Sequence, residues 1–280
     1  MLQLRSCAGR ESGGQLFEVT LNSLDNGTAE PRLRQRESWF QYASPQVFYP
    51  IAGRLIPWFA WAAAMLGAAG LYVGFFVAPT DFQQGESYRI IFIHVPAAWM
   101  SMFLYVVMAF WAGIGLAFNT RLSGMMASAI APTGAMFTFL ALWTGSLWGK
   151  PTWGTWWVWD ARLTSELILL FLYFGFMALQ AAIDDARRAD KAGAVLALVG
   201  VINIPIIYFS VQWWNTLHQG ASVSLTRAPT MAATMLTGML LMALAFWMYS
   251  TAATLLRVRS IIVERERRAD WIGQYVEQPA

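Results

Sequence analysis

Apolar residues occur along this chain in long uninterrupted blocks, without the short periods of surface helices or half-buried strands. Six blocks reach or exceed the length of roughly 20 residues that an α-helix needs to cross a bilayer. The six blocks cover residues 55–78, 90–118, 122–149, 163–183, 192–211 and 228–256. The pattern therefore predicts an all-α integral membrane protein whose core is a six-transmembrane-helix bundle.

Charged side chains are nearly absent from the predicted spans. Five of the six spans contain no Asp, Glu, Lys or Arg, and the fourth contains only Glu166, near its start. The whole chain is 57% hydrophobic and 12% charged, whereas soluble domains carry about 25% charged residues. Composition thus argues against a soluble domain and makes the lipid bilayer the expected surroundings of the protein.

Polar segments flank the predicted bundle on both sides. Residues 1–47 are polar and rich in turn-forming residues, which predicts a poorly ordered N-terminal extension. Residues 48–260 form one membrane domain with short connections, and residues 261–280 form a basic C-terminal tail. Because no long segment separates the spans, we expect the function to lie in the bundle or at its outer face.

The basic residues are divided unequally between the two sides of the predicted membrane domain. Of the 19 Lys and Arg residues, 15 lie before the first span or after the second, fourth and sixth spans. Cytoplasmic segments carry such an excess, so both termini are predicted to be cytoplasmic. The bias also explains the net charge of +3, so the charge gives no reason to expect a nucleic acid partner.

The connection after the third predicted span is rich in tryptophan. The segment "WGTWWVWDAR" holds Trp153, Trp156, Trp157 and Trp159 within seven residues. Trp153, Trp156, Trp157 and Asp160 recur at the spacing of one helix face, which predicts a short Trp-rich interfacial helix on the outer side. An ordinary aromatic belt places Trp more sparsely at helix ends. The cluster therefore suggests a flat platform for a large planar ligand such as a porphyrin.

Charged residues follow the tryptophan cluster directly. Arg162 is placed to pair with the propionates of such a ligand, because guanidinium groups bind carboxylates in a two-pronged geometry. Arg89 and Arg227 are further candidates for that contact by charge and side. Arg162 and Glu166 stand four residues apart, which predicts an ion pair and a structural role for Glu166.

The chain contains two histidines, His94 and His218, and both are predicted on the outer side. A single histidine at a membrane interface is more often a hydrogen-bonding side chain than a ligand. Two on the same side as the tryptophan cluster could bind the iron of one haem from opposite faces, because imidazole is a common axial ligand. Pro96 is expected to stiffen the helix start around His94, and Asn203 and Pro205 to kink the fifth span.

The cysteine content excludes two kinds of chemistry that depend on cysteine pairs. Cys7 is the single cysteine, so the chain has no C-x-x-C motif for disulfide exchange and no C-x-x-C-H motif for covalent haem attachment. The sequence also offers no paired carboxylates and no Gly-rich phosphate loop on the outer side. We therefore expect a binding and transfer protein, not an enzyme.

Three segments carry a resemblance to a known family. "WGKPTWGTWWVWDARLTSELILLFLY" resembles the WWD signature of haem-handling membrane proteins, and "SYRIIFIHVPAAW" and "VQWWNTLHQG" flank it. With six spans, residues 48–260 resemble the haem exporter protein C family of the bacterial cytochrome c maturation system. By position, His94 and His218 match the two axial ligands of that family, and residues 153–160 match its WWD platform.

The resemblance implies a specific role. Proteins of this family bind haem b transiently at the periplasmic face of the inner membrane and present it to a periplasmic haem chaperone. They work with an ATPase subunit, a second membrane subunit and a small single-span subunit. The resemblance thus implies a multi-pass inner-membrane protein that transfers its haem and leaves ATP hydrolysis to a partner.

Three alternatives stay open from the sequence. A haem lyase-type enzyme would join haem to apocytochrome, but larger proteins of the WWD group have more spans and more histidines. An electron-transfer cytochrome b would hold haem between histidine pairs at membrane depth, whereas His218 is predicted in a connection. A haem permease subunit would need a polar path through the spans, of which Glu166 is the single charged residue.

Overall fold

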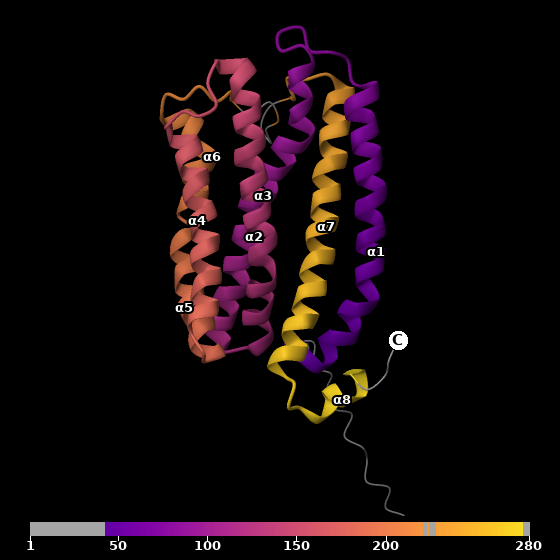
Figure 1. The fold of residues 1–280 in the computed structure, drawn as a ribbon, viewed down its shortest axis with the longest axis vertical. Helices are drawn as coiled ribbons and strands as arrows, with labels where there is room; N and C mark the ends of the chain where they lie inside the picture. The colour runs from indigo at the N-terminus through magenta and orange to yellow at the C-terminus, as the bar shows by residue number, and fades with distance from the viewer. Residues whose placement is uncertain (1–42, 221–222, 224–227, 277–280) are drawn as a thin grey trace, which may run out of the picture. The chain divides into compact units, whose positions relative to one another are not determined.

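The computed structural model describes residues 43–220, 223 and 228–276. Its elements are α1 (Pro45–Tyr72), the π-helical turn η2 (Val73–Val77), the 3₁₀ turn η3 (Glu86–Ile90), α2 (Ile91–Phe118), α3 (Arg121–Trp153), α4 (Ala161–Ala182), α5 (Ala186–Gly200), α6 (Asn203–Trp213), α7 (Ala233–Arg265) and α8 (Asp270–Val276), as Figure 1 shows. No β-strand occurs within these residues. The prediction of an all-α fold is confirmed.

Within the described residues, six helical segments are long and apolar enough to cross a membrane. They are Pro45–Val77, Glu86–Phe118, Arg121–Trp153, Ala161–Ala182, Ala186–Trp213 and Ala233–Arg265. Each contains most of one predicted span, so the six-span prediction is confirmed. The helices are longer than the apolar blocks because polar residues at the ends continue the same hydrogen-bonded turns.

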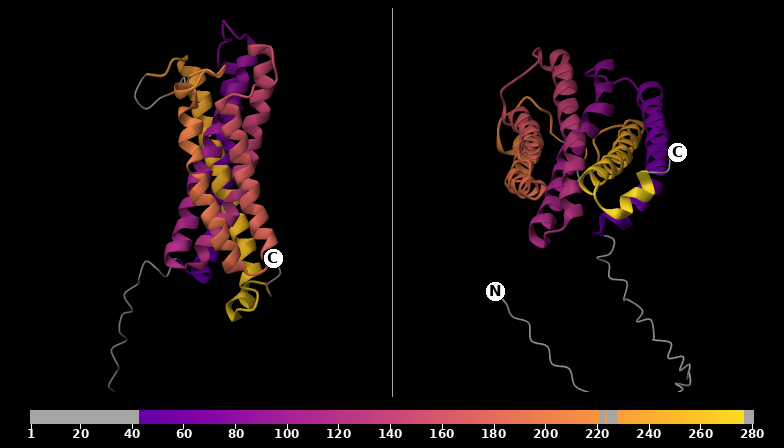
Figure 2. Two further views of the ribbon diagram at one scale, coloured as in Figure 1. Left: turned by 90° about the vertical axis from the view of Figure 1, so that its left-hand side faces the viewer. Right: turned by 60° about the horizontal axis from the view of Figure 1, so that its bottom comes forward.

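The helices form three groups (Figures 1 and 2). α2 and α3 pack along each other in the centre, α1 and α7 pair on one side, and α4, α5 and α6 lie on the other side. Close packing in the centre depends on small residues, as is usual between membrane helices. A Cβ atom at Gly134 would come within 2.1 Å of the Tyr173 ring. Gly134 of α3 therefore leaves room for the Tyr173 ring of α4. The Tyr173 hydroxyl donates to the Ser101 carbonyl of α2 at 2.8 Å.

The fifth span is interrupted. α5 ends at Gly200 and α6 begins at Asn203, so the helix is broken beside Asn203 and Pro205, where the sequence predicts a kink. The Asn203 side chain donates to the Ser165 carbonyl at 2.8 Å, which ties the break to α4. After the interruption, α6 leads into the connection that carries His218.

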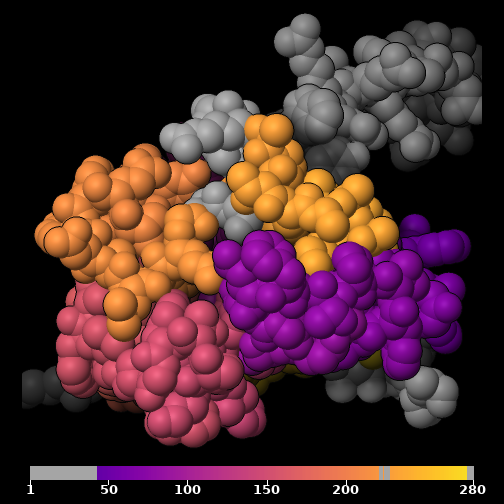
Figure 3. Space-filling view, turned by 90° about the horizontal axis from the view of Figure 1, so that it is seen from above, coloured from indigo at the N-terminus to yellow at the C-terminus, as the bar shows by residue number. Residues whose placement is uncertain are grey.

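The helices run alternately up and down, so every second connection lies at the same end. We call the end with residues 78–85, 154–160 and 214–220 the upper end, and the end with α8 the lower end (Figure 1). Figure 3 looks down on the upper end, where the connection after α6 (orange) lies next to the residues after α3 (pink). The chain thereby gathers the predicted site residues at one end.

Two predicted boundaries fall only partly within the described residues. α1 begins at Pro45, inside the range predicted for the N-terminal extension, and residues 1–42, with Cys7, lie outside the described residues. In the predicted tail, α7 continues to Arg265 and a short helix, α8, follows. The three-part division of the chain stays a prediction.

Candidate functional site

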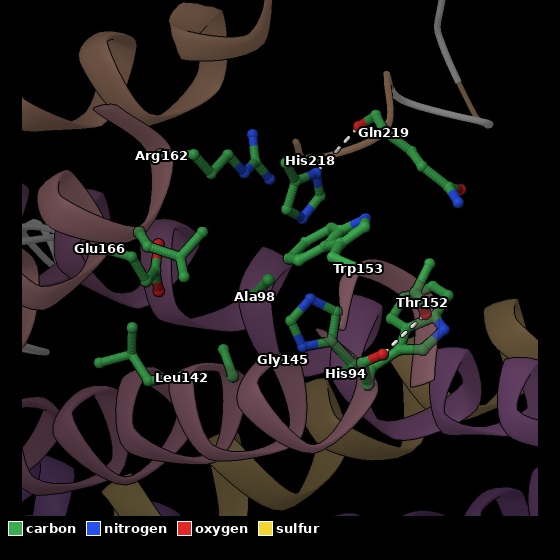
Figure 4. Close-up of a pocket in the computed structure, with 13 residues that line it drawn as sticks. His94, Ala98, Leu142, Gly145, Thr152, Trp153, Arg162, Glu166, His218 and Gln219 are labelled. Atoms are coloured by element: carbon green, nitrogen blue, oxygen red, sulfur yellow. Dashed lines mark hydrogen bonds between the residues drawn. The ribbon is translucent and has the colours of Figure 1, made fainter. Parts of the chain in front are cut away.

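A pocket opens at the upper end between α2, α3, α4 and the connection after α6. The space inside it is about 670 Å³ when the open mouth is included. It is lined by His94, Ala98, Ala141, Leu142, Gly145, Trp148, Thr152, Trp153, Arg162, Leu163, Glu166, His218 and Gln219 (Figure 4). The walls are mostly apolar, with a few polar groups converging at one place.

His94 lies near the start of α2 and is buried. Its Nδ1 atom lies 3.1 Å from the Thr144 hydroxyl oxygen on α3. The Thr144 hydroxyl donates its single hydrogen to the Leu140 carbonyl at 2.6 Å, so toward His94 it acts as acceptor. His94 therefore carries its proton on Nδ1, and its Nε2 atom keeps a lone pair with which it can bind a metal.

Two further residues of α3 fix the His94 ring. A Cβ atom at position 145 would lie 2.9 Å from the Cε1 atom of His94, so the ring lies against α3 only because that residue is Gly145. Trp148 meets the ring edge to face at 5.6 Å between centroids. The Trp148 indole in turn donates to the Gln84 side chain at 2.7 Å. These contacts hold the ring in place, and the stiffening of α2 by Pro96 stays a prediction.

His218 reaches the same pocket from the connection after α6. The backbone N–H of His218 donates to the Thr216 hydroxyl at 2.8 Å. The Nδ1 atom of His218 lies 2.9 Å from the Gln219 carbonyl oxygen. A carbonyl oxygen can only accept, so His218 also carries its proton on Nδ1 and leaves Nε2 free. Burial, and secondly the positive charge of Arg162, lower the pKa of His218. The ring is thus neutral, as a metal ligand must be.

The two imidazoles are at a distance that suits a shared metal. Their ring centroids lie 6.3 Å apart with 34° between the planes. Two imidazoles bound to opposite sides of one metal have centroids about 6 Å apart, because each metal–nitrogen bond is about 2 Å and the nitrogen is about 1 Å from the ring centre. No cluster of three or more His, Cys, Asp or Glu side chains forms a metal site in the described residues. A haem iron needs only the two histidines from the protein.

Arg162 and Glu166 both line the pocket, but they do not form the predicted ion pair. Arg162 donates to the Ile207 carbonyl of α6 at 3.0 Å. Glu166 accepts from the Ser101 hydroxyl of α2 at 2.7 Å. Each side chain finds a partner on a different neighbouring helix, so the prediction of a pair within α4 is wrong. Arg162 points toward His218 in Figure 4, where it adds a positive charge to the pocket.

The predicted interfacial helix is also wrong. α3 continues to Trp153, where Gly154 ends it by adopting a left-handed conformation with φ of 77°. Residues 155–160 are not helical, and Asp160 is the N-cap of α4, because its side chain accepts from the Leu163 N–H at 2.8 Å. The tryptophans therefore do not share one helix face.

Of the four clustered tryptophans, Trp153 alone lines the pocket, 6.0 Å from the His218 ring. Trp156 and Trp159 are 52% and 75% exposed, and Trp157 packs against Trp159 at 5.4 Å. The Nε1 atom of Trp157 and the Oδ2 atom of Asp160 are buried without a hydrogen-bond partner in the described residues. Residues 154–160 thus form an aromatic rim beside the pocket, which differs from the predicted platform.

Arg89 and Arg227, the other two candidates for a propionate contact, are not found in the pocket lining of the described residues. Arg89 does not line the pocket, and its guanidinium donates to the Gly74 carbonyl at 2.6 Å and the Ala78 carbonyl at 3.2 Å. It also pairs with Glu86, so it braces the connection between α1 and α2. Arg227 lies outside the described residues.

Three residues that surround His94 could not be predicted from the sequence. Thr144, Gly145 and Trp148 are uncharged, and nothing in their spacing relates them to His94. Gly145 and Trp148 stand eight and five positions before Trp153, and a small residue and a Trp near a helix end fit any membrane helix. Only the packing of α2 against α3 shows that they surround a histidine.

Comparison with known proteins gives consistent results. The family model described as "Heme exporter protein C" matches residues 38–273. "Heme exporter protein C" of Escherichia coli (strain K12) is 49% identical over 237 residues, which are 84% of this chain and 95% of that protein. The Bradyrhizobium diazoefficiens protein of the same name is 50% identical over 228 residues, 81% of this chain and 86% of that protein. A Marchantia polymorpha protein named "Putative cytochrome c biosynthesis ccmC-like mitochondrial protein" is 51% identical over 166 residues, 59% of this chain and 69% of that protein.

Proposed function

The chain belongs to the heme exporter protein C family, and on that basis we propose that it handles haem for cytochrome c maturation. It binds haem b transiently at the upper end, with the iron between His94 and His218. It then presents the haem to a periplasmic haem chaperone. In this proposal the upper end faces the periplasm, the protein spans the bacterial inner membrane, and both termini are cytoplasmic.

One observation carries the proposal. His94 and His218 stand 124 positions apart in the sequence (218 − 94), yet their rings lie 6.3 Å apart in one pocket. Both rings place their proton on Nδ1 through hydrogen bonds to the protein, which leaves two Nε2 lone pairs for a metal. Two unrelated structural histidines would not be expected to share this arrangement.

The remaining pocket residues suit the cargo. Arg162 provides a positive charge for a propionate, and the apolar side chains of α3 and α4 provide contacts for the macrocycle. When haem is bound, its iron has two axial positions for His94 and His218. The pocket residues would orient the haem and exclude water from one side of it. No covalent step by this chain is required, because handover exchanges axial ligands.

The aromatic rim of residues 154–160 is the proposed contact for the chaperone. Exposed Trp156 and Trp159 offer apolar area beside the pocket mouth, where an incoming protein would reach the edge of the haem. Family membership also supports a complex with an ATPase subunit, a second membrane subunit and a small single-span subunit. The chain acts there as the haem-binding subunit.

The absorption spectrum of the purified protein tests the proposal. Wild type titrated with haem should give a Soret band and sharp reduced α and β bands of a six-coordinate low-spin iron. The double variant His94→Ala/His218→Ala should lose these bands and fail to load the chaperone. Trp159→Phe is the control, because it keeps an exposed aromatic ring outside the pocket and should keep the wild-type spectrum. If the double variant bound haem with an unchanged spectrum and loaded the chaperone normally, the proposal would be wrong.

A further inference from the structure

A second cavity lies at the lower end, on the opposite side of the membrane domain from the histidine pocket. The space inside it is about 500 Å³ when the part open to solvent is included. It lies between the end of α2, the start of α3, the end of α4 and the start of α5. The membrane-crossing segments end or begin at Phe118, Arg121, Ala182 and Ala186. The cavity is therefore at the level where the hydrocarbon core meets the aqueous phase.

The lining of this cavity is divided into an apolar part and a basic part. Ala112, Leu116, Ala127 and Phe176 form the apolar part on α2, α3 and α4. The basic part consists of Arg121, Arg187 and Lys191, at the ends of the helices. A cavity that is apolar toward the bilayer and basic toward water fits an amphiphile with an anionic headgroup better than a soluble ion.

The cavity lining also includes one acidic side chain, Asp190, and its charge is neutralised by an ion pair. Asp190 pairs with Arg265 of α7 at 2.8 Å, and Arg121 pairs with Glu266 at 2.7 Å. Arg187 and Lys191 form no ion pair within the part of the chain that the structure describes. Since they stand four residues apart on α5, both lie on the side that faces the cavity. The cavity thus has an excess of two positive charges.

The start of α3 adds backbone donors to the same wall. Thr120 is the N-cap of α3, but its side chain makes no capping hydrogen bond and instead donates to the Ser123 hydroxyl at 2.6 Å. The first N–H groups of a helix carry a partial positive charge and bind phosphate oxygens readily. Here they supplement the cationic side chains of α5 and do not form a site by themselves.

We propose that this cavity binds the phosphate headgroup of an anionic phospholipid. Arg187, Lys191 and the start of α3 contact the phosphate, and an acyl chain lies against Leu116 and Phe176. Basic pockets between membrane helices recognise anionic headgroups in this way, because the leaflet supplies the ligand at high local concentration. The inference is independent of the haem site and does not rest on its function.

Native mass spectrometry of the delipidated full chain tests this site, with phosphatidylglycerol or phosphatidylcholine added in mixed micelles. Wild type should retain one phosphatidylglycerol molecule per chain in preference to phosphatidylcholine. Arg187→Gln/Lys191→Gln should weaken that binding about tenfold or more, because both headgroup cations are lost. Both side chains are exposed, so the variant should fold, and its circular dichroism checks this.

Two further variants make the test specific. Arg188→Gln/Arg267→Gln removes the same charge at the same end from side chains that do not line the cavity, and it should keep wild-type binding. The exchange Arg187→Lys/Lys191→Arg keeps both charges and should also keep it. An equal loss in the control pair, or no preference between the two lipids in wild type, would overturn the proposal. Inorganic phosphate at millimolar concentration should not displace the lipid, and displacement would show a soluble-anion site instead.

Discussion

The two histidines of the upper pocket are held in different ways. His94 is 8% exposed, sits on α2 and is fixed by Thr144, Gly145 and Trp148 of a neighbouring helix. The hydrogen bonds that hold His218 come from residues within two positions of it. One candidate ligand is therefore fixed by tertiary packing, and the other by its own connection.

This difference suits the proposed function, in which the bound haem is released to a chaperone. Local structure in a connection opens at lower free energy than a helix packed in the core. A haem held by both histidines could then lose the bond to His218 first, while His94 keeps it in place for the chaperone. The order of ligand exchange would follow from the way in which each ring is supported.

Replacing the histidines one at a time tests this asymmetry most strongly. His94→Ala should lower the haem content at least about tenfold, because the variant lacks both the rigidly held iron ligand and its buried ring in the pocket wall. His218→Ala should retain five-coordinate haem, and millimolar imidazole should restore its low-spin spectrum from the solvent side. Imidazole should not rescue His94→Ala. Equal rescue of both variants would show that the two positions are equally accessible.

Thr144 tests whether the proton position on His94 matters. Thr144→Val keeps the shape but removes the acceptor for Nδ1–H, and partners of this kind are worth about 10–100-fold in metal affinity. We expect haem binding to weaken by that factor, whereas Thr144→Ser should retain it. A haem titration followed by absorbance, together with the reduction potential, measures the effect. Wild-type values for both quantities in Thr144→Val would show that the hydroxyl is only structural.

Gly145 tests how closely the His94 ring must approach α3. In Gly145→Ala the new Cβ atom would come within 2.9 Å of the ring, so the ring must shift by several tenths of an ångström. We expect about tenfold weaker haem binding, equivalent to about 1.4 kcal/mol. Gly67→Ala on α1 is the control, because its Cβ atom would meet Ala245 at an ordinary 3.8 Å. A similar loss in both variants would point to general destabilisation.

Lowering the pH should destabilise the connection that carries His218, and this effect should begin only below the usual pKa of histidine. Because the pKa of His218 is lowered in the folded chain, the unfolded connection binds a proton more tightly than the folded one. The stability of this connection should be constant above about pH 6.5 and fall as the pH drops below it. The low-spin spectrum should therefore persist from pH 8 to about 6.5 and decline only below that value. His218→Ala should lack this transition, and a midpoint at or above the usual histidine value would contradict the lowered pKa.

The sequence predicted those features best that depend on a single physical effect, such as the burial of apolar residues in the bilayer. Each span must bury about 20 apolar residues, so the apolar blocks alone locate the six helices. Because successive spans alternate in direction, counting them also places His94, Trp153 and His218 at one end. The break at Asn203 follows from a nearby proline, which acts within its own helix.

The site itself depended on contacts between helices. The spacing of Trp153, Trp156 and Trp157 fitted a helix, but Gly154 and the capping side chain of Asp160 decide the backbone there. Arg162 and Glu166 could have paired, yet carbonyl and hydroxyl groups on α6 and α2 lie closer to them.

The membrane fold, the number of spans and the end of the bundle that carries both histidines could be predicted from the sequence, because the bilayer acts on each apolar segment separately. Three other features are visible only in the folded chain: the contacts of Thr144 and Gly145 with the His94 ring, the position of Trp153 in the pocket, and the basic cavity between α5 and α3 at the lower end. These features arise from distances of a few ångströms between residues of different helices, and such distances are set by packing, which leaves no periodic trace in the sequence.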